Sequence, residues 1–404
     1  MASNEIDELL AEGVAGAVER ERTEFDRLAA PFTDALVLFG AGNMGRTIRR
    51  KLRTVGVEPL AFADNNPALQ GRLVEGVPVL SPVEAANRFG SSAAFVVSIW
   101  GVGATDRMAA RVRQLRDLGC RKVVPFPPLF WKFPALFLPC QMVDLPHRVH
   151  EDAWVVRQVC DLWADDFSRR EYLAQLKWRL RADFDCMADP VPQTIYFPSD
   201  LFRLGEREVF VDCGAYDGDT VESFLKLTGR RFQWIVAFEP DPANHEKLRK
   251  SVESLAPELA RRIEIRREAV GASDGPVRFA ALGTEGSGIG EGDLEVECVT
   301  LDRVLKDRPG PSHIKMDIEG AEIEALRGAR ETIARHAPVL AICSYHRQPD
   351  LWNIPNLIHS LNPDYRLFLR PHLIEGWDVV CYAVPPQWGR IASCGGLATR
   401  QLRR

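Results

Sequence analysis

Two stretches of the chain place a short apolar run directly before a glycine-rich turn and a helical segment. The first, residues 35–52, reads ALVLF, GAGNMG and RTIRRKL, and the second, residues 209–227, opens with VFVDC and GAYDG. A short apolar run between turn signals is typical of a strand buried on both faces, as in parallel sheets covered by helices. Each stretch therefore predicts the start of its own α/β unit.

Apolar runs continue to alternate with helical segments after both starts. The first unit has further runs at PLAFAD, VPVL, AAFVVSI and KVVPF, from which we expect a small parallel sheet of about four strands. The second unit continues through WIVAFE, IEIRREAV, VRFAAL, EVECVT, HIKMD and PVLAICSY. Its last two runs, YRLFLR and DVVCYAVP, predict an antiparallel pair at the sheet edge.

The length of 404 residues exceeds one ordinary domain. A proline- and aromatic-rich stretch, PFPPLFWKFPALFLPC, marks a boundary because repeated proline cannot continue a helix or a central strand. The expected parts are an amphipathic helix at 1–30, a small Rossmann-like domain at 31–128, a helical linker at 129–205, a larger α/β domain at 206–386 and a flexible tail at 387–404.

Charge and hydropathy exclude several classes of protein. The net charge is −5 and no basic stripe is visible before the last residues, so we expect no nucleic-acid partner. No apolar run approaches the roughly 18 residues that cross a bilayer, and the start lacks a signal peptide, so we expect a cytoplasmic protein without a membrane span. The helix at 1–30 is expected to dock on another part of the chain or on a second subunit of a homo-oligomer.

The second unit places an acid and two glycines where a parallel sheet binds ligands. Asp212 ends the first strand, Gly214 and Gly218 follow in the turn, and Glu239 ends the next strand. Ligands of such sheets lie beyond the carboxyl ends of the strands, and an acid at the second strand can accept both hydrogen bonds of a ribose diol. An acid before the first glycine would repel a phosphate, so a cationic or amine-bearing ligand with an intact ribose is expected.

The blocks VFVDCGAYDGDT, AFEPDP, EAVGASDG, VTLDRVL and IKMDIEGAEIEALRGA resemble those of FkbM-type S-adenosylmethionine-dependent methyltransferases, over roughly Tyr196 to Tyr382. The resemblance implies a seven-stranded Rossmann-like class I methyltransferase sheet with an antiparallel edge hairpin. It also implies S-adenosylmethionine as cofactor. The implied cofactor residues are Asp212, Gly214, Tyr216, Asp217 and Gly218 at the methionine part, Glu239 at the ribose, and Glu268, Ala269 and Val270 at the adenine.

Three residues near the expected site carry groups suited to removing a proton from an acceptor. Asp317 and Glu319 follow the strand HIKMD, and His346 follows the next strand. Methyl transfer needs an aligned acceptor and a group that takes its proton, so we expect these three to be catalytic. They could also be metal ligands, but no H-x-x-H, H-x-H or Asp-Asn pair supports a metal, and none is expected. A [DN]-P-P-[YF] signature is absent, which favours a hydroxyl acceptor over an amine or amide.

The first unit contains the pattern G-x-G-x-x-G between its first strand and helix. Gly40, Gly42 and Gly45 form the pattern, and Asp64 ends the next strand, as in dinucleotide sites. The unit is short, and it resembles the small Rossmann-like domain found ahead of sugar acyltransferases and some glycan-modifying enzymes. That resemblance implies a bound nucleotide or nucleotide-sugar, while NAD binding and a purely structural role stay open.

We therefore expect a methyltransferase that uses S-adenosylmethionine to methylate a hydroxyl of a small molecule or saccharide. The acceptor would be sugar-like, glycan-like or another natural product. One alternative is an NAD-dependent oxidoreductase or epimerase that works at GAGNMG. Another is a non-catalytic protein that binds nucleotide-sugar.

Overall fold

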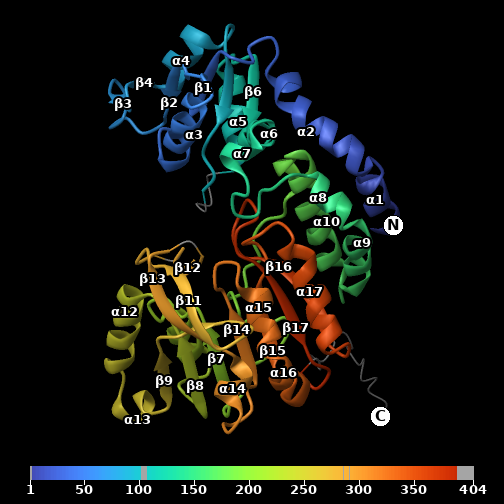
Figure 1. Cartoon of the computed structure of the whole chain (residues 1–404), viewed down its shortest axis with the longest axis vertical. Helices are drawn as coiled ribbons and strands as arrows, with labels where there is room; N and C mark the ends of the chain where they lie inside the picture. Colours follow the sequence, from blue (N-terminus) through green and yellow to red (C-terminus); the bar gives the residue numbers. More distant parts are fainter. Residues whose placement is uncertain (1, 102–106, 285, 291, 389–404) are drawn as a thin grey trace, which may run out of the picture.

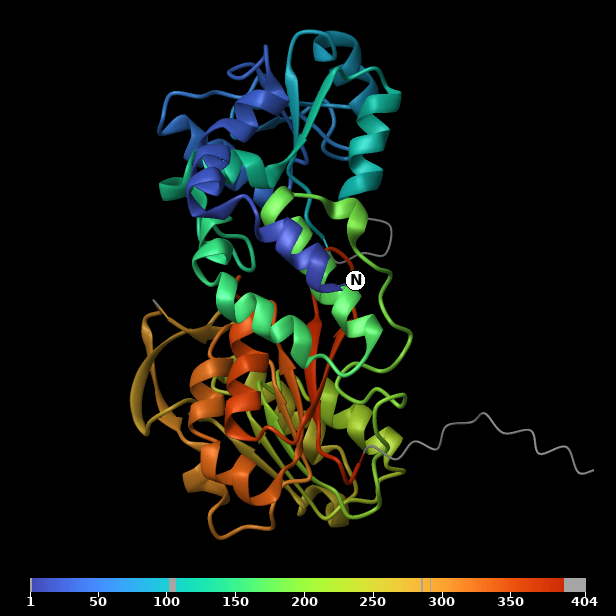
Figure 2. The same ribbon diagram turned by 90° about the vertical axis from the view of Figure 1, so that its right-hand side faces the viewer.

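The computed structural model describes residues 2–101, 107–284, 286–290 and 292–388. It contains two α/β units at opposite ends of the molecule, with a group of helices between and beside them (Figure 1). A view turned by 90° shows the same arrangement, with the N-terminal helices lying along the middle group (Figure 2). None of the helices in these ranges is long and apolar enough to cross a membrane.

The first unit is a six-stranded sheet in the order β3-β4-β2-β1-β5-β6. All neighbouring strands are parallel except β3, which is antiparallel to β4. The expectation of about four strands was too low. One strand that the pattern missed is β3, which has only two residues and is too short to show a repeat of apolar residues. The strands are β1 Leu36–Phe39, β2 Ala61–Ala63, β3 Leu73–Val74, β4 Val77–Leu80, β5 Ala94–Val97 and β6 Lys122–Pro125, and the helices are α3 Asn43–Arg53, α4 Pro82–Phe89 and α5 Met108–Asp117.

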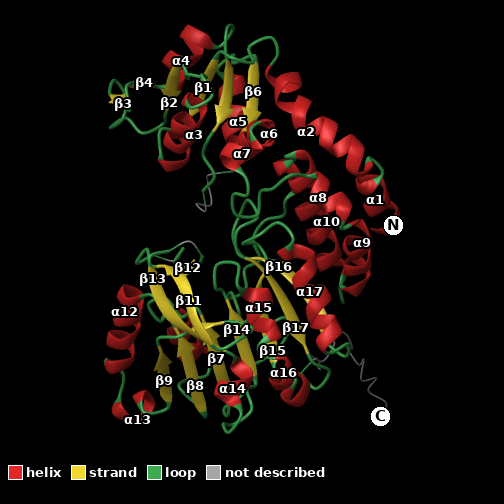
Figure 3. Cartoon of the chain, viewed as in Figure 1, coloured by secondary structure: helices red, strands yellow, loops and turns green. Residues whose placement is uncertain are grey.

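The proline-rich stretch after β6 forms helices rather than a plain break. Proline stands in the first turn of α6 and of α7, where its missing N–H would lack an intrahelical partner in any case. The helical middle segment then continues to residue 186, as the helix-coloured ribbon of Figure 3 shows. Its helices are α6 Phe126–Lys132, α7 Pro134–Phe137, α8 His147–Glu151, α9 Ala153–Leu162, α10 Asp166–Arg181 and the 3-10 turn η1 Phe184–Cys186.

The N-terminal segment forms two helices, α1 Ala2–Leu10 and α2 Gly13–Ala29, instead of the single helix expected at 1–30. Gly13 takes φ +69, a left-handed conformation that glycine adopts without a Cβ clash, and the chain changes direction there.

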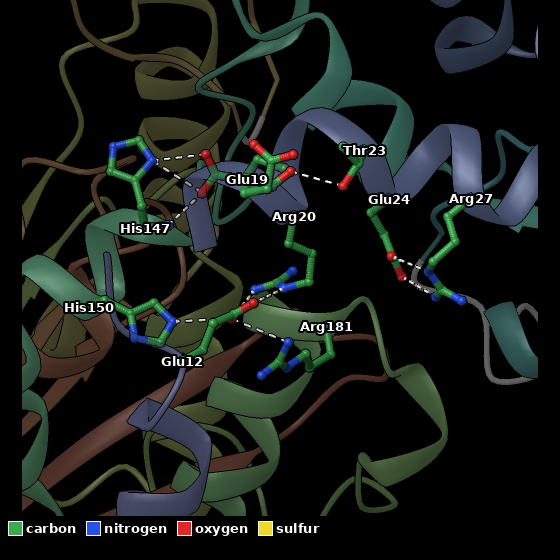
Figure 4. Close-up of polar contacts among 10 residues, drawn as sticks. Glu12, Glu19, Arg20, Thr23, Glu24, Arg27, His147, His150 and Arg181 are labelled. Atoms are coloured by element: carbon green, nitrogen blue, oxygen red, sulfur yellow. Dashed lines mark hydrogen bonds and ion pairs between the residues drawn. The ribbon is translucent and has the colours of Figure 1, made fainter. Parts of the chain in front are cut away.

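Helix α2 is fixed to the middle segment by ion pairs (Figure 4). Glu12 binds Arg20 through two hydrogen bonds of 2.8 and 2.9 Å and lies 3.2 Å from Arg181 of α10. Glu21 accepts a hydrogen bond of 2.6 Å from the backbone N–H of His147 at the start of α8. The N-terminal helices thus dock on the middle segment of the same chain, which is one of the two docking sites expected for residues 1–30.

The second unit is built on a seven-stranded sheet in the order β16-β17-β15-β14-β7-β8-β9. The five strands from β15 to β9 in this order run parallel to one another, whereas β17 is antiparallel to both β15 and β16. The predicted α/β class and edge hairpin are confirmed. The strands are β7 Val209–Cys213, β8 Trp234–Phe238, β9 Ile263–Arg266, β14 His313–Met316, β15 Val339–Cys343, β16 Arg366–Pro371 and β17 Val379–Val384.

A separate four-stranded sheet takes the segments VRFAAL and EVECVT, which the alternation had placed with the main series of strands. This sheet has a small core of its own around Phe279 and Cys298. The apolar residues of these two runs therefore face that core and not the core of the main sheet. Its strands are β10 Ala269–Val270, β11 Gly275–Ala280, β12 Gly288–Ile289 and β13 Leu294–Val299. The helices of the second unit are α11 Asp219–Leu227, α12 Pro242–Glu253, α13 Pro257–Ala260, α14 Leu301–Leu305, α15 Glu322–Arg327, α16 Arg330–His336 and α17 Asp350–Leu361.

Aromatic residues join the two units through the middle segment. The ring of Trp100, just after β5, lies 6.1 Å from that of Trp178 in α10 and 4.7 Å from that of Trp377 in the β16–β17 loop. Its Nε1 donates a hydrogen bond of 3.1 Å to the carbonyl oxygen of Glu375 in the same loop. The first unit therefore supports a loop that borders the cavity of the second.

Candidate active site

A cavity of about 400 Å³ lies beyond the carboxyl ends of β7, β8, β14 and β15. Its wall also includes residues 195 and 196 of the segment leading into β7, and Leu373, Trp377 and Asp378 of the β16–β17 loop. This is the edge at which open parallel sheets bind ligands. The cavity is thus formed by the second unit, together with the middle segment.

The glycine-rich turn after β7 comes very close to the end of β14. Gly214 has φ +82, and a Cβ built on it would lie 1.9 Å from the carbonyl oxygen of Asp317. A side chain at this position would therefore push two strand ends apart. Gly214 and Tyr216 both line the cavity, and the Tyr216 ring has the ammonium group of Lys247 5.0 Å from its centre.

Asp212 does not line the cavity, in contrast to what the resemblance implies. Its carboxylate is fully buried, with Oδ1 3.1 Å from Nζ of Lys315 on the neighbouring strand. Burial raises the pKa of Asp212 to about 6, although Lys315 opposes that shift. Lys315 also donates a hydrogen bond to the carbonyl oxygen of Gly214. The acid that seemed to demand a cationic ligand is thus balanced by the protein's own lysine.

Two other residues of the turn are also absent from the cavity wall. Gly218 takes φ +95 as the N-cap of α11, and Asp217 accepts a hydrogen bond of 3.3 Å from the backbone N–H of Asp219. Both shape the turn and the start of the helix, and the contact of Asp217 and Gly218 with the methionine part stays a prediction.

Glu239 lies in the cavity wall where the sequence places it, and its carboxylate is held by two backbone donors. Oε2 accepts a hydrogen bond of 2.8 Å from the N–H of Tyr216, and Oε1 accepts one of 2.9 Å from the N–H of Asp241. Burial raises the pKa of Glu239 to about 7. Both oxygens keep lone pairs that can accept further hydrogen bonds.

The expected adenine segment also borders the cavity. Glu268, Ala269 and Val270 all belong to its wall. Glu268 is oriented by a hydrogen bond of 2.6 Å from Arg266. The segment lies beside the carboxyl end of β9, one strand beyond Glu239, so the two sets of residues face one cavity.

Asp317, Glu319 and His346 come together at the other side of the same cavity. Nε2 of His346 lies 3.2 Å from Oδ1 of Asp317 and 3.5 Å from Oε1 of Glu319, and Nδ1 lies 2.9 Å from Oε1 of Glu322. Burial lowers the pKa of His346, but the three carboxylates raise it well above the usual range. The ring is therefore an ion-pair partner of the acids, which is not the state of a free general base.

Two tyrosines complete this cluster. Tyr196, in the segment leading into β7, donates a hydrogen bond of 2.7 Å from its hydroxyl to Oδ2 of Asp317, and the ring of Tyr345 lies 4.2 Å from that of His346. The sequence reasoning missed Tyr196 because it lies outside the strands. Its only local signal is the polar-aromatic segment PQTIYFP in front of β7.

Five non-glycine residues of the cavity wall adopt left-handed backbone conformations. They are Gln141 with φ +49, Tyr196 with φ +66, Tyr216 with φ +47, Glu319 with φ +56 and Asp378 with φ +48. Such conformations cost of order 1–3 kcal/mol each and cluster at functional sites, where surrounding contacts hold them. The cavity is thus a place where the fold maintains strained backbone.

Close packing explains Gly40 and Gly45 of the first unit, but not Gly42. A Cβ on Gly45 would lie 1.9 Å from the carbonyl oxygen of Gly40, while Gly42 has open space as the N-cap of α3. Asp64 accepts hydrogen bonds from the N–H of Ala41 at 2.7 Å and of Asn66 at 2.8 Å. These contacts tie the turn to β2, and binding of a nucleotide there remains a prediction.

Comparisons with known proteins agree with this site. The family model described as the methyltransferase FkbM domain matches residues 212–373. The crystal structure of methyltransferase FkbM from Methylobacillus flagellatus KT is 25% identical, has a TM-score of 0.77, and is matched over 95% of this chain and 100% of that one.

A precorrin-6y C5,15-methyltransferase from Geobacter metallireducens GS-15 is 14% identical over 46% of this chain and 84% of that one, and its TM-score of 0.29 supports no argument. No curated protein sequence matches the chain. The family match spans the cavity-lining strands, and the structural likeness extends over both units. Residues 212–373 therefore match the methyltransferase FkbM domain, and the chain as a whole is similar to an FkbM methyltransferase of known structure.

Proposed function

We propose that this protein transfers the methyl group of S-adenosylmethionine to a hydroxyl of a sugar-like, glycan-like or other natural-product acceptor. The observation that carries the proposal is Glu239, whose two carboxylate oxygens are fixed by backbone N–H groups at the cavity edge of an FkbM domain. A carboxylate held in this way, one strand away from a glycine turn, suits a ribose diol.

The cofactor would extend along the cavity from Glu239 in both directions. Glu268, Ala269 and Val270 would flank the adenine, and Gly214 and Tyr216 would border the methionine part. Asp212 would position the glycine turn indirectly. It pairs with Lys315, which in turn donates a hydrogen bond to the carbonyl oxygen of Gly214.

The acceptor would lie against Asp317, Glu319 and His346, the three residues that we propose as catalytic. Methyl transfer forms a C–O bond while the S–CH₃ bond breaks, and the bonding electrons remain on sulfur. The acceptor hydroxyl loses its proton in the process. The protein's contribution is to align the oxygen with the methyl carbon and to stabilise the oxygen as its proton leaves.

The experiment that tests the function is calorimetric titration of the full chain with S-adenosylmethionine and, separately, with NAD. We expect S-adenosylmethionine to bind, with an affinity reduced at least tenfold in Glu239→Ala and unchanged in Asp64→Ala, since each good hydrogen bond to a charged group contributes about 1.5–3 kcal/mol. Asp64→Ala is a matched control because it also removes a carboxylate at the end of a second strand. Binding of NAD alone, lost in Asp64→Ala, would make the first unit the active one and overturn the proposal.

A further inference from the structure

We propose that Asp317, Glu319 and His346 bind a divalent first-row transition-metal cation at the acceptor side of the cavity. The sequence argued against a metal because the three residues form no familiar spacing. The folded chain brings one donor atom from each residue into a group whose members all lie within 4.8 Å of one another. Binding of the cation can be tested by itself, whereas its part in catalysis rests on the proposed methyl transfer.

The spacing of the donor atoms suits a metal ion. Nε2 of His346 lies 3.2 Å from Oδ1 of Asp317 and 3.5 Å from Oε1 of Glu319. Ligands at about 2.1 Å from a metal are about 3.0 Å apart at adjacent octahedral positions and about 3.4 Å apart at tetrahedral ones. Both distances from Nε2 are therefore close to those between two ligands of one metal ion, and the third pair of donor atoms lies within 4.8 Å.

Two of these donor atoms are buried and make no hydrogen bond within the part of the chain that is described. They are Oδ1 of Asp317 and Nε2 of His346, and the His346 side chain is 2% exposed. The other oxygen of Asp317 is already occupied by the hydroxyl of Tyr196. The carboxylate therefore turns its remaining oxygen towards the imidazole and Glu319, where a cation would replace the 3.2 Å ion pair between Oδ1 and Nε2 as the partner of both atoms.

Glu322 forms an ion pair with the ring nitrogen of His346 that is not a proposed ligand. Its Oε1 lies 2.9 Å from Nδ1 of His346 and is itself fixed by a hydrogen bond of 2.8 Å from the backbone N–H of Ile318. Metal-binding histidines commonly donate their second ring N–H to a carboxylate, which fixes the tautomer and leaves the other nitrogen free to ligate. Here that other nitrogen is Nε2, which faces Asp317 and Glu319.

The donor set indicates both the kind of cation and its role. One imidazole and two carboxylates suit Mn²⁺, Fe²⁺, Co²⁺ or Zn²⁺ better than Ca²⁺, which prefers oxygen ligands alone. Three protein ligands leave coordination positions open, and all three residues border the cavity. A cation there would bind the acceptor hydroxyl and lower its pKa, so that the proton leaves to water before the oxygen attacks the methyl carbon.

The test is titration of EDTA-treated protein with Mn²⁺, followed by calorimetry and by the electron paramagnetic resonance signal of free Mn²⁺. We expect one site per chain, with affinity at least tenfold weaker in Glu319→Gln. The variant Glu324→Gln is the matched control, because Glu324 lies in the same segment but pairs with Arg327 at the surface. We expect its affinity to equal that of the wild type.

A second variant, Glu322→Gln, tests the orientation of the imidazole. It removes the carboxylate beside Nδ1 of His346 but leaves all three proposed ligands unchanged. Loss of such a partner weakens metal binding by about 10–100-fold. Circular dichroism shows whether this buried variant folds, and Glu319→Gln decides the question if it does not. Absence of Mn²⁺ and Co²⁺ binding at millimolar concentration in the wild type, or equal affinity in Glu319→Gln, would overturn the proposal.

Titration with S-adenosylmethionine on the same EDTA-treated samples separates this inference from the proposed function. Binding of S-adenosylmethionine without any binding of Mn²⁺ would overturn the metal site alone. Binding of Mn²⁺ without S-adenosylmethionine would support the metal site and contradict the proposed cofactor. Binding of both, with methylation restored by Mn²⁺ after EDTA treatment, would support both.

Discussion

Lys315, which lines the cavity, forms an ion pair with Asp212, with Nζ 3.1 Å from Oδ1 and both side chains no more than 2% exposed. The two residues are direct partners in the parallel pairing of β14 with β7. A buried pair of this kind is costly to break, because the remaining charge has no compensation. The pair therefore makes the strand ends beside the glycine turn dependent on each other.

We expect Lys315→Met to lower the free energy of unfolding by about 3–5 kcal/mol at neutral pH, since it leaves the Asp212 carboxylate unpaired. The double variant with Asp212→Leu should recover much of that loss. Urea unfolding of the two single variants and the double variant measures the coupling. Simple addition of the two single losses would show that the residues do not stabilise each other.

Glu239 should make the stability of the protein depend on pH in a way that Glu239→Gln does not. Burial raises the folded-state pKa to about 7, whereas a glutamate in an unfolded chain titrates near ~4.3. The wild type therefore loses stability through this group as the pH rises from 4 to 7, by about 3 kcal/mol in total. The stability of the variant minus that of the wild type should rise over that interval, and a constant difference would contradict the assignment.

The close approach of Gly214 to β14 can be separated from its backbone conformation. An alanine at Gly214 would have both positive φ and a Cβ 1.9 Å from a carbonyl oxygen, while one at Gly229 would have positive φ and open space. We expect Gly229→Ala to cost about 1 kcal/mol, from the left-handed conformation alone, and Gly214→Ala to cost several times more. Thermal unfolding compares the two, and equal losses would rule out the steric effect.

Removing the hydroxyl of Tyr196 should affect methyl transfer more than stability. Tyr196→Phe deletes the donor to Asp317, and loss of a partner that orients a site residue reduces activity by about 10–100-fold. Tyr365→Phe is the control, since its hydroxyl donates a hydrogen bond of 2.6 Å to the carbonyl oxygen of Pro338 at a position outside the cavity wall. Both variants should lose about 1 kcal/mol of stability. A kcat that falls equally in the two would show that the effect is general.

Local patterns in the sequence predicted the parts of the molecule that local interactions govern. The apolar runs at β7 and β8, the turn that begins with Gly214 and the edge hairpin all lie where short-range periodicity places them. The position of Glu239 follows from the same reasoning, because a residue at the carboxyl end of a parallel strand lies at the edge of the sheet where ligands bind. The two-residue strand β3 escaped it, and the runs of β11 and β13 were predicted but not their separate sheet, since sheet membership depends on distant pairing.

Partners that come from distant segments could not be read from the chain. The spacing of Asp212 and Lys315 along the sequence contains no sign that β7 and β14 are neighbours, so a balanced acid looked like a ligand-binding one. Tyr196 reaches Asp317 from the segment before β7, and Glu322 at the start of α15 meets His346 after β15. Residue types and strand ends are properties of the local chain, whereas charge balance and ligand geometry arise from contacts between segments that only folding brings together.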